Sequence, residues 1–419
     1  MTNAFPMVRG RLMAEGVPVE ALASRYGTPL YVYSRSHIES QFAALAEAMA
    51  PVEPLICYSV KVNTNAAVIG TLAELGAGAD VVSGGELYRA RRAGVPPSRI
   101  VFAGVGKTRE EIEYALRAGI LFFTVESEPE LYRIADCARR LGRKARIALR
   151  ANPDVDPETH HYISTGKAEN KFGLDLRRIE RAYRRAAAHP SLEIAGLHMH
   201  IGSQLLNPAP YGHALERVAD LCRRLRARYP TFRHLDLGGG LGIQYKPGQQ
   251  PLDPARFAKT VLPFLKESGL RIVLEPGRFL VGNAGLLVMR VQYVKDGPSK
   301  KFIIVDAGMN DLIRPPLYQA HHEIVPVRAA RGTVRGDVVG PICESADFLA
   351  QDRELPAVRE GDLLAVLSAG AYGFAMASNY NSRPRPAEVM VKGRRHALVR
   401  RREGREDLVR GEQLPRWMP

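Results

Sequence analysis

Short apolar runs of strand type alternate with amphipathic stretches of helical type along the first two thirds of the chain. The intervening stretches, such as REEIEYALRAG and EPELYRIADCARRLG, carry apolar positions at helical spacing. This alternation predicts an α/β fold, a (β/α)8 TIM-like barrel rather than an open doubly wound sheet. The eight expected strands are residues 54–60, 79–82, 100–104, 121–125, 145–150, 194–201, 232–238 and 270–276.

The pattern changes after about residue 285, where the helical periodicity fades. Runs of strand type follow, among them GLLVMRVQYVK, KFIIVDAG, GTVRGDVVG and AEVMVKG, and turn residues separate them. The segment TPLYVYS, residues 28–34, also has the pattern of a strand outside the eight. We therefore expect a barrel domain over residues 35–283 and an all-β domain over 284–419, joined by the N-terminal segment 1–34.

A long non-periodic stretch and a basic C-terminal segment stand out from this pattern. The long stretch NPDVDPETHHYISTGKAENKFG, after the fifth strand, is interpreted as a functional loop because connections of this length without periodicity are uncommon. The basic segment HALVRRREGREDLVRGE is expected to form a final strand and a cap rather than a disordered tail.

Composition places the chain among soluble enzymes. It has 419 residues, of which 46% are hydrophobic and 25% charged, and no apolar run is long enough to span a membrane. The N-terminus lacks the features of a signal peptide, and the four cysteines are far apart without a CxxC pair. We expect a cytoplasmic protein with no membrane partner, no disulfide framework and no zinc site.

The formal net charge of +15 raises the question of nucleic-acid binding. The basic residues are mostly arginines spread along helical stretches such as ERAYRRAAAH, with no basic stripe interleaved with aromatic residues. We interpret them as solvated helix faces and expect no nucleic-acid partner. The excess positive charge favours anionic substrates and cofactors.

Unusual residues stand at the expected ends of the barrel strands, which is the functional face of this fold. Lys61 follows the first strand within the run ICYSVKVN, where a desolvated ammonium would be costly without a partner. One interpretation is that Lys61 extends into water from an edge strand; the other is that it has a chemical role. LGGGLG, residues 237–242, ends the seventh strand, and EPGR, residues 275–278, ends the eighth.

The glycines and histidines allow more than one interpretation. A dinucleotide site needs a helix directly after the glycines, and IQYKPGQQPLDP cannot be one, so that site is rejected. A phosphate-binding loop and a plain tight turn both remain open. His198 and His200 share a face of the sixth strand, but no third ligand has metal-site spacing, so no metal is expected. We interpret His198 as a satisfied core residue and His200 as a residue of the barrel mouth.

Together these residues suit one cofactor. Pyridoxal phosphate needs a lysine for a Schiff base, a partner for its ring nitrogen, a phosphate site and a stacking group. A strand-end lysine, a carboxylate, a glycine loop and an imidazole at one barrel mouth supply these parts. The sequence therefore predicts a pyridoxal 5'-phosphate site with Lys61 as the attachment point.

A set of motifs spread over residues 20–410 carries a family resemblance. They are YSVKVN, KFGLD, GLHMHIGSQ, DLGGGLGI, EPGRFLVGNAG, DAGMNDLIRPPLY, GPICESADFLAQDREL and GAYGFAMASNYNSRPRPAEV. Together they resemble the diaminopimelate decarboxylase family of fold type III pyridoxal-phosphate enzymes. The resemblance implies an alanine racemase-like barrel with a C-terminal β-domain. It also implies decarboxylation of meso-2,6-diaminopimelate at its D-centre to L-lysine and CO2, the last step of lysine biosynthesis.

The resemblance also implies roles for the cofactor-binding residues. Lys61 forms the Schiff base, His200 stacks on the pyridine ring and Glu275 meets the ring nitrogen. A carboxylate there keeps the nitrogen protonated, which favours decarboxylation, whereas the related alanine racemases have an arginine. The full set is Lys61, Asp80, His200, Ser203, Gly239, Gly240, Glu275, Pro276, Gly277, Arg278 and Tyr372.

The implied substrate contacts are mostly in the second half of the chain. They are Arg278, Arg314, Tyr318, Glu344 and Tyr372. Cys343 is implied to be the catalytic acid, supplied by the partner subunit of a homodimer with shared active sites. From its residue type alone, Cys343 could instead be a small buried hydrophobic residue.

Two alternatives belong beside this interpretation. One is a related decarboxylase acting on ornithine, arginine, lysine or carboxynorspermidine. The other is a non-catalytic barrel protein that binds pyridoxal phosphate. Such binding proteins lack a β-domain and a Cys-Glu-Ser loop, so the second half of this chain favours an enzyme.

Overall fold

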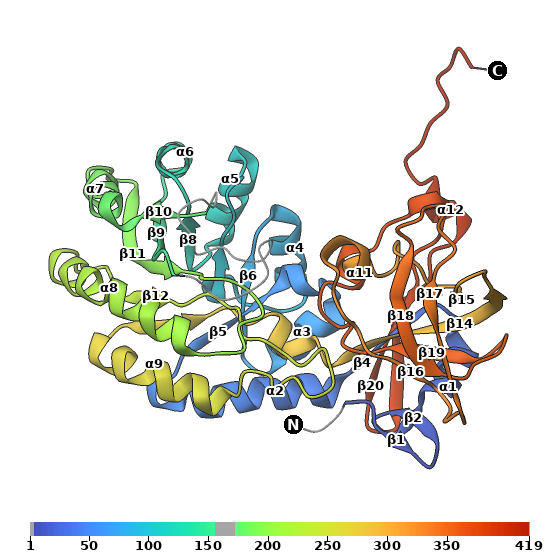
Figure 1. Cartoon of the computed structure of the whole chain (residues 1–419). Helices are drawn as coiled ribbons and strands as arrows, with labels where there is room; N and C mark the ends of the chain where they lie inside the picture. Colours follow the sequence, from blue (N-terminus) through green and yellow to red (C-terminus); the bar gives the residue numbers. More distant parts are fainter. Residues whose placement is uncertain (1–3, 156–171, 419) are drawn as a thin grey trace. The chain divides into compact units, whose positions relative to one another are not determined.

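The computed structural model describes residues 4–155 and 172–418 of the chain (Figure 1). The chain divides into two compact units. The barrel unit comprises residues 38–244 and 250–281, and the β-unit comprises the N-terminal residues up to 37, residues 245–249 and residues 282–419.

The barrel unit contains a closed ring of eight parallel strands. The ring is closed because β8 pairs with β9 and β13 pairs with β5. All eight predicted strands are present, so the predicted barrel is confirmed. In ring order the strands are β5 (Leu55–Ser59), β6 (Gly78–Val81), β7 (Ile100–Phe102), β8 (Phe122–Val125), β9 (Ala145–Asn152), β11 (Leu192–Met199), β12 (His234–Asp236) and β13 (Arg271–Leu274).

Two features of the ring bear on the site. The two-residue strand β10 (Leu174–Asp175) pairs with the end of β9 outside the ring. Strand β5 is hydrogen-bonded on both sides, to β13 and to β6. The interpretation of Lys61 as a residue of an edge strand is therefore wrong.

The helices of the barrel unit lie outside the ring of strands (Figure 1). Side-chain caps explain where several of them begin: Ser83, Thr108 and Ser127 each accept a hydrogen bond from a first-turn amide. The helices are α2 (Arg35–Ala48), α3 (Ala66–Glu74), α4 (Gly84–Arg92), α5 (Arg109–Ala118), α6 (Glu128–Arg140), α7 (Leu176–Ala187), α8 (Ala209–Arg228), α9 (Pro254–Ser268) and α10 (Arg278–Val281).

The glycine loop after β12 is not followed directly by a helix. Helix α9 begins only at Pro254, where the preceding Asp253 accepts a hydrogen bond from the amide of Arg256. The rejection of a dinucleotide-binding turn is therefore confirmed. Buried side chains from six of the strands pack into one cluster; they are Cys57, Val101, Phe122, Ala148, Ala195 and Val273.

The β-unit is built around a nine-stranded sheet. The predicted strand at residues 28–34 is β4 (Leu30–Ser34), which pairs antiparallel with β14 and parallel with β20. The other strands are β14 (Gly285–Asp296), β15 (Lys301–Val305), β16 (Ile324–Pro326), β17 (Thr333–Val339), β18 (Phe348–Pro356), β19 (Leu363–Val366), β20 (Ala387–Lys392) and β21 (Arg395–Arg400).

Several small elements complete the β-unit. The predicted final strand and cap correspond to β21 and the short helix α12 (Arg405–Leu408). A three-stranded sheet of β1 (Met7–Val8), β2 (Arg11–Ala14) and β3 (Val17–Pro18) precedes α1 (Val19–Tyr26), and α11 (Arg314–Tyr318) follows β15. The N-terminal sheet and β18 were not predicted.

The loop interpreted as functional, residues 152–173, falls largely on 156–171, which lie outside the described residues. Over the part that the structure describes, no helix is long and apolar enough to cross a membrane. All four cysteines are free thiols in this structure.

Candidate active site

Lys61 lies at the mouth of the barrel with a carboxylate beside it. It belongs to the short 3-10 turn η2 (Val60–Val62) directly after β5, and its Nζ is 2.6 Å from Oδ2 of the buried Asp80 on β6. The hydroxyl of Ser59 donates to the same oxygen at 2.8 Å. Burial raises the pKa of Asp80, the nearby Glu275 adds to the rise and Lys61 opposes it. The Lys61 side chain is 39% exposed, so it can reach a molecule in the mouth.

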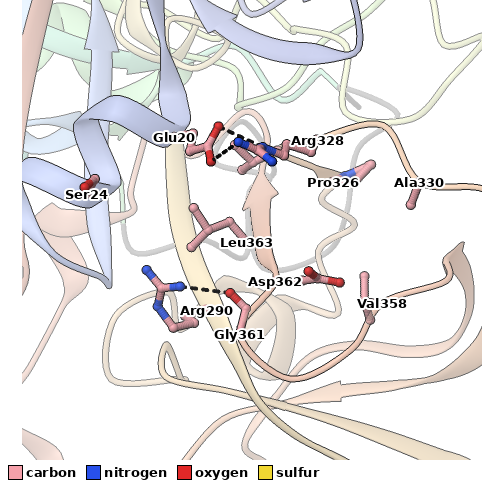
Figure 2. A pocket seen from close by; sticks show the side chains of 11 residues that line it. Glu20, Ser24, Arg290, Pro326, Arg328, Ala330, Val358, Gly361, Asp362 and Leu363 are labelled. Atoms are coloured by element: carbon pink, nitrogen blue, oxygen red, sulfur yellow. Dashed lines mark hydrogen bonds and ion pairs between the residues drawn. The ribbon is translucent and has the colours of Figure 1, made fainter.

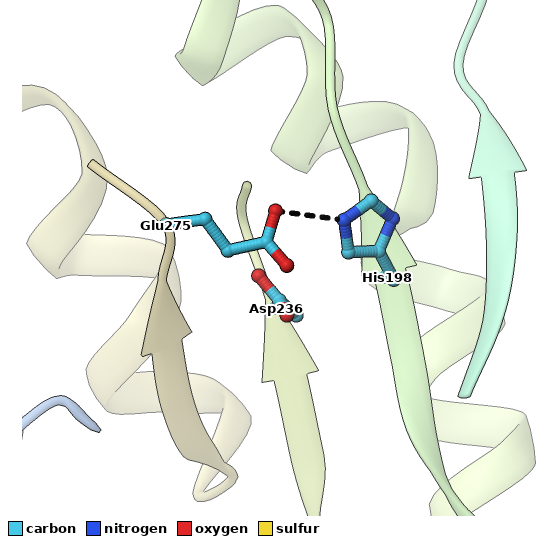
Figure 3. A group of neighbouring side chains, drawn as sticks. All are labelled: His198, Asp236 and Glu275. Carbon is cyan, nitrogen blue, oxygen red and sulfur yellow. Dashed lines mark hydrogen bonds and ion pairs between the residues drawn. The ribbon is translucent and has the colours of Figure 1, made fainter. Parts of the chain in front are cut away.

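Glu275, the first residue after β13, is a buried carboxylate that meets a histidine. Its Oε2 is 3.2 Å from Nε2 of His198 on β11 (Figure 3). Burial raises the pKa of Glu275, but its interactions with His198, Lys61 and His200 together outweigh burial and lower the pKa to about 2. Glu275 is therefore an ionised group inside the barrel.

His198 corrects one prediction. It is buried, as expected of a core residue, but it is not simply a satisfied one. Its Nε2 contacts Glu275, and its Nδ1 has no hydrogen-bond partner among the described residues. His198 thus belongs to the surroundings of the candidate site, which its spacing from His200 did not reveal.

His200 follows β11 and presents a neutral ring. Its Nδ1 accepts a hydrogen bond from the amide of Gly239 at 3.1 Å, so the ring proton resides on Nε2. Burial lowers the pKa of His200 well below its usual value, and Arg150 lowers it further. An uncharged flat imidazole is suited to packing against another ring.

The glycine loop allows close approach of the backbone. A Cβ at Gly239 would lie 2.2 Å from the carbonyl oxygen of Glu275, and one at Gly240 would lie 2.4 Å from that of Gly202. Gly240 also has a φ of +112°, which favours glycine. Because the Gly239 amide donates to His200, that amide serves the imidazole in this structure. Beside the loop, Arg278 donates from Nη2 to the Ser203 hydroxyl at 3.0 Å.

Arg150, at the end of β9, was not predicted. Its Nη1 bonds the buried Glu126 carboxylate at 2.9 Å, and its guanidinium lies 4.7 Å from the centre of the Phe172 ring. Its Nη2 is buried and has no hydrogen-bond partner within the described part of the chain. The sequence could have indicated Arg150, because it is a charged residue at the end of the apolar run ARIALR, just as Lys61 is a charged residue at the end of an apolar run.

In the β-unit, Arg314 is buried and held in one orientation. Its Nη1 donates to Nε2 of His322 at 2.8 Å. The other ring nitrogen of His322 is 2.9 Å from the carbonyl oxygen of Leu367, which can only accept, so the proton is on Nδ1. The ring of Tyr245 lies 4.7 Å from the guanidinium carbon of Arg314. His322 and Tyr245 were not predicted. Tyr318, at the end of the same helix α11, is half-buried.

Cys343 and Glu344 lie on an exposed loop of the β-unit. The alternative that Cys343 is a small buried residue is therefore wrong. The Cys343 amide donates to Oδ1 of Asn381 at 2.8 Å. The hydroxyl of Tyr380 donates to Glu344, and this bond raises the pKa of Tyr380.

Hydrogen bonds to Asp347 hold the start of the loop that contains Cys343 and Glu344. The buried Asp347 carboxylate accepts from the amides of Ile342 and Met309, both at 2.6 Å. The segment with Cys343 is thus joined to the one that leads to Arg314. Elsewhere in the β-unit, Tyr372 has a left-handed φ of 57°, a conformation that non-glycine residues seldom adopt.

The β-unit also contains a pocket of about 340 Å³ (Figure 2). The ion pair of Arg328 with Glu20 lies at one side, and Arg290 donates to the carbonyl of Gly361 at 2.8 Å. None of the described residues that line this pocket was predicted for the site.

Comparison with known proteins decides the family. The family of pyridoxal-dependent decarboxylases, in its pyridoxal binding domain, matches residues 35–282. The diaminopimelate decarboxylase of Aquifex aeolicus is 52% identical over 401 residues, which are 96% of this chain and 95% of that protein. This chain belongs to the diaminopimelate decarboxylase family.

Other members of the diaminopimelate decarboxylase family are similarly close. The Pseudomonas aeruginosa enzyme is 52% identical over 98% of this chain and 99% of its own length. The crystal structure of the Helicobacter pylori enzyme complexed with L-lysine has a TM-score of 0.90 at 43% identity, covering 94% of this chain and 98% of that one. The fold predicted from the sequence, a barrel with an added β-domain, is the fold of this family.

The cofactor of the diaminopimelate decarboxylase family, pyridoxal phosphate, fits the residues at the barrel mouth. Asp80 Oδ1 and Arg150 Nη2 are buried polar atoms without hydrogen-bond partners in the described structure, so each can bind a polar group of a ligand. The glycines at 239 and 240 leave no room for side chains, which suits a backbone cradle. Lys61 supplies the amine.

Proposed function

We propose that this protein catalyses the pyridoxal-phosphate-dependent decarboxylation of meso-2,6-diaminopimelate at its D-centre, giving L-lysine and CO2. The observation that carries the proposal is the group at the barrel mouth, where Lys61, the neutral His200 and the ionised Glu275 lie close enough to influence one another's pKa. The relatives that share about half of this sequence over nearly its full length support the choice of substrate.

Each of these residues has a separate task in the proposed reaction. Bound pyridoxal phosphate supplies an electron sink for the electron pair left when the carboxyl group departs as CO2. Lys61 attaches the cofactor, and His200 packs against its ring. The Glu275 carboxylate holds a proton on the ring nitrogen, which strengthens that sink. Ser203, Gly239, Gly240 and Tyr372 are proposed to hold the phosphate group.

Recognition of the distal end of the substrate is assigned to side chains of the β-unit and to Arg278. Diaminopimelate carries a second amino-acid group with its own carboxylate and ammonium. Arg314 is suited to that carboxylate because a guanidinium binds it through paired hydrogen bonds, and His322 and Tyr245 fix its direction. Tyr318, Glu344 and Tyr372 are proposed to complete the contacts, with Glu344 on the distal ammonium.

Cys343 is proposed to return a proton to the substrate carbon after CO2 leaves. Its exposure on a loop fixed by Asn381 and Asp347 supports a role outside the core of its own unit. We propose that it acts in the active site of a second copy of the chain, in a homodimer.

CO2 release from a panel of amino acids tests the proposal. The wild-type protein with pyridoxal phosphate should release CO2 from meso-diaminopimelate. Lysine and ornithine should be poorer by about 10⁴–10⁵, since a site built for a charged group rejects an analogue that lacks it. Preference for ornithine, arginine, lysine or carboxynorspermidine would select the related decarboxylases instead. No CO2 from any substrate, with cofactor bound, would favour the non-catalytic alternative.

A further inference from the structure

A buried carboxyl group to which the proposed reaction gives no role lies beside Glu275. Asp236, the last residue of β12, has no exposed surface, and its Oδ1 accepts a hydrogen bond from the amide of Gly238 at 2.9 Å. Its other oxygen, Oδ2, has no donor among the described residues, and neither has Glu275 Oε1. Two oxygens that can only accept are thus buried without a donor, which is costly for both.

The two carboxyl groups are near one another. Atoms of Asp236, Glu275 and His198 lie within 4.8 Å of each other, and the carboxyl groups are within hydrogen-bonding reach (Figure 3). Two ionised carboxylates at such a distance repel each other strongly away from water, whereas one shared proton converts the repulsion into a hydrogen bond. A single proton would therefore satisfy both of the unpartnered oxygens.

We propose that Asp236 is protonated in the working enzyme and donates a hydrogen bond from Oδ2 to Oε1 of Glu275. In this role Asp236 is a positioning residue: it holds the Glu275 carboxylate in place and supplies the donor that lets it stay ionised. The inference rests on the proposed function for the task of Glu275 toward the cofactor, but the proton on Asp236 is a property of the protein itself.

The charges around Asp236 favour this arrangement. Glu275 after β13 and Asp80 on β6 both disfavour a negative Asp236, and the Lys61 ammonium is paired with Asp80. Cys57 on β5 is an uncharged neighbour, because burial raises the pKa of its thiol well above the usual value. His198 on β11 contacts Glu275, which explains why Glu275 rather than Asp236 is the ionised partner.

The pKa shifts of Asp236 and Glu275 agree with a protonated Asp236 beside an ionised Glu275. Burial raises the pKa of Asp236 well above its usual value, and the charge of Glu275 raises it further, against a lowering contribution from the Gly238 amide. The pKa of Glu275 moves the opposite way, to about 2. The two carboxyl groups thus have separate roles, one as donor and one as anion.

Infrared spectroscopy of the purified holoenzyme tests the proton directly. Protein labelled with ¹³C at the aspartate side-chain carboxyl should show the shifted C=O band of a protonated acid at pH 9. A group such as Asp311, whose pKa burial raises to about 7, is ionised at that pH. Absence of this band from the wild type would overturn the proposal without any variant. Persistence of the full band in D236N would assign it to another aspartate and would also overturn it.

Two substitutions separate the hydrogen bond from the charge. The amide in Asp236→Asn keeps an acceptor for Gly238 and a donor for Glu275, so kcat and the pH dependence of the cofactor absorbance should stay within about threefold and half a pH unit of the wild type. Asp236→Ala removes the donor, and its kcat should fall at least about tenfold with little change in KM, as expected for loss of a hydrogen bond to a charged group. Equal losses in both variants would show that the charge of Asp236 matters and would contradict the proposal.

A bound cation is the competing explanation for three such side chains in proximity. It would need both carboxylates ionised, so metal analysis of the holoenzyme finding one tightly held ion per chain, lost in D236N, would overturn the proposal. The infrared band needs no substrate. If the band is present but diaminopimelate is not decarboxylated, the proposed function is wrong and the protonation of Asp236 stands. If diaminopimelate is decarboxylated but the band is absent, the protonation of Asp236 is wrong and the proposed function stands.

Discussion

At the scale of single residues, the candidate site is organised by charges that are paired or neutralised. The Lys61 ammonium faces Asp80, the Glu275 anion faces His198, and His200 is kept neutral by burial and by Arg150. Lys61 and Glu275 were recognisable in the sequence because charged residues stood at the ends of apolar runs. Asp236 was not, since its partner lies almost 40 residues away and only the pairing of β12 with β13 brings the two together.

Substitution of Lys61 tests the attachment of the cofactor. The wild-type protein reduced with borohydride should gain the mass of the reduced cofactor on the peptide that contains Lys61. Lys61→Ala should show no such mass and should lose turnover, because no other amine takes its place at the end of β5. A labelled peptide elsewhere in the chain, or retained turnover in Lys61→Ala, would contradict the assignment.

Substitution of Arg314 tests the distal carboxylate site. Arg314→Lys keeps the positive charge but loses the planar pair of donors, so kcat/KM for diaminopimelate should fall by about 10- to 100-fold while the cofactor stays bound. The matched control is Arg328→Lys, an exposed arginine paired with Glu20, which should change kcat/KM by less than about twofold. Diaminopimelate turnover that survives Arg314→Lys unchanged would remove Arg314 from the site.

At the scale of elements, the barrel was predictable and parts of the β-unit were not. Parallel strands buried on both faces give nearly continuous apolar runs, so all eight were visible. Strand β18 was missed because its sequence FLAQDRELP places charged residues at exposed positions in the middle of the strand. At the start of α4, the Glu86 carboxylate accepts a hydrogen bond from the amide of Val82 at 2.9 Å, which lowers the pKa of Glu86. Burial outweighs this bond and raises the pKa of Glu86 to about 7.

The raised pKa of Glu86 gives a prediction for stability against pH. The folded state binds the Glu86 proton more tightly than the unfolded state, where the pKa is about 4.5. Its contribution is therefore complete below pH 4.5 and is lost as the pH rises through 7. At about 1.4 kcal/mol per pKa unit, the loss of stability is at most about 3.5 kcal/mol, and it is smaller because the side chain is partly exposed to solvent.

Chemical denaturation between pH 4.5 and 8 provides the measurement. Glu86→Gln should lack this loss, so its free energy of unfolding relative to the wild type should improve as the pH rises across that range. The control is Glu113→Gln, a residue of α5 that pairs with the exposed Arg117 and should leave the pH dependence unchanged. Parallel curves for Glu86→Gln and the wild type would show that Glu86 ionises normally.

At the scale of the whole molecule, the proposed homodimer makes a prediction about shared sites. Cys343 and Glu344 are exposed on the β-unit, and we propose that they serve the site of the second copy. Cys343→Ala alone should slow turnover by ~10²–10⁴-fold, the usual contribution of a positioned acid, without loss of cofactor. Lys61→Ala should be inactive for a different reason, because it lacks the amine that attaches the cofactor.

Mixing these two variants tests the sharing. In a mixed dimer one site has both Lys61 and Cys343 intact and the other has neither, so activity should return to at most about half that of the wild type per mixed dimer. Mass spectrometry of the intact dimers confirms that subunits have exchanged. Exchange without any recovery of activity would place Cys343 in the site of its own chain or in none.

In the proposed reaction, this chain removes one particular carboxyl group of diaminopimelate and protonates the carbon left behind. The most direct measurement is turnover of meso-diaminopimelate, labelled with ¹³C in the carboxyl group of its D-centre, in D2O with the pyridoxal-phosphate-loaded protein. We expect labelled CO2 and unlabelled L-lysine in equal amounts, with a single deuterium on the lysine carbon that lost the carboxyl group. Retention of the label in the lysine, formation of D-lysine, or exchange of deuterium without CO2 release would contradict the proposed reaction.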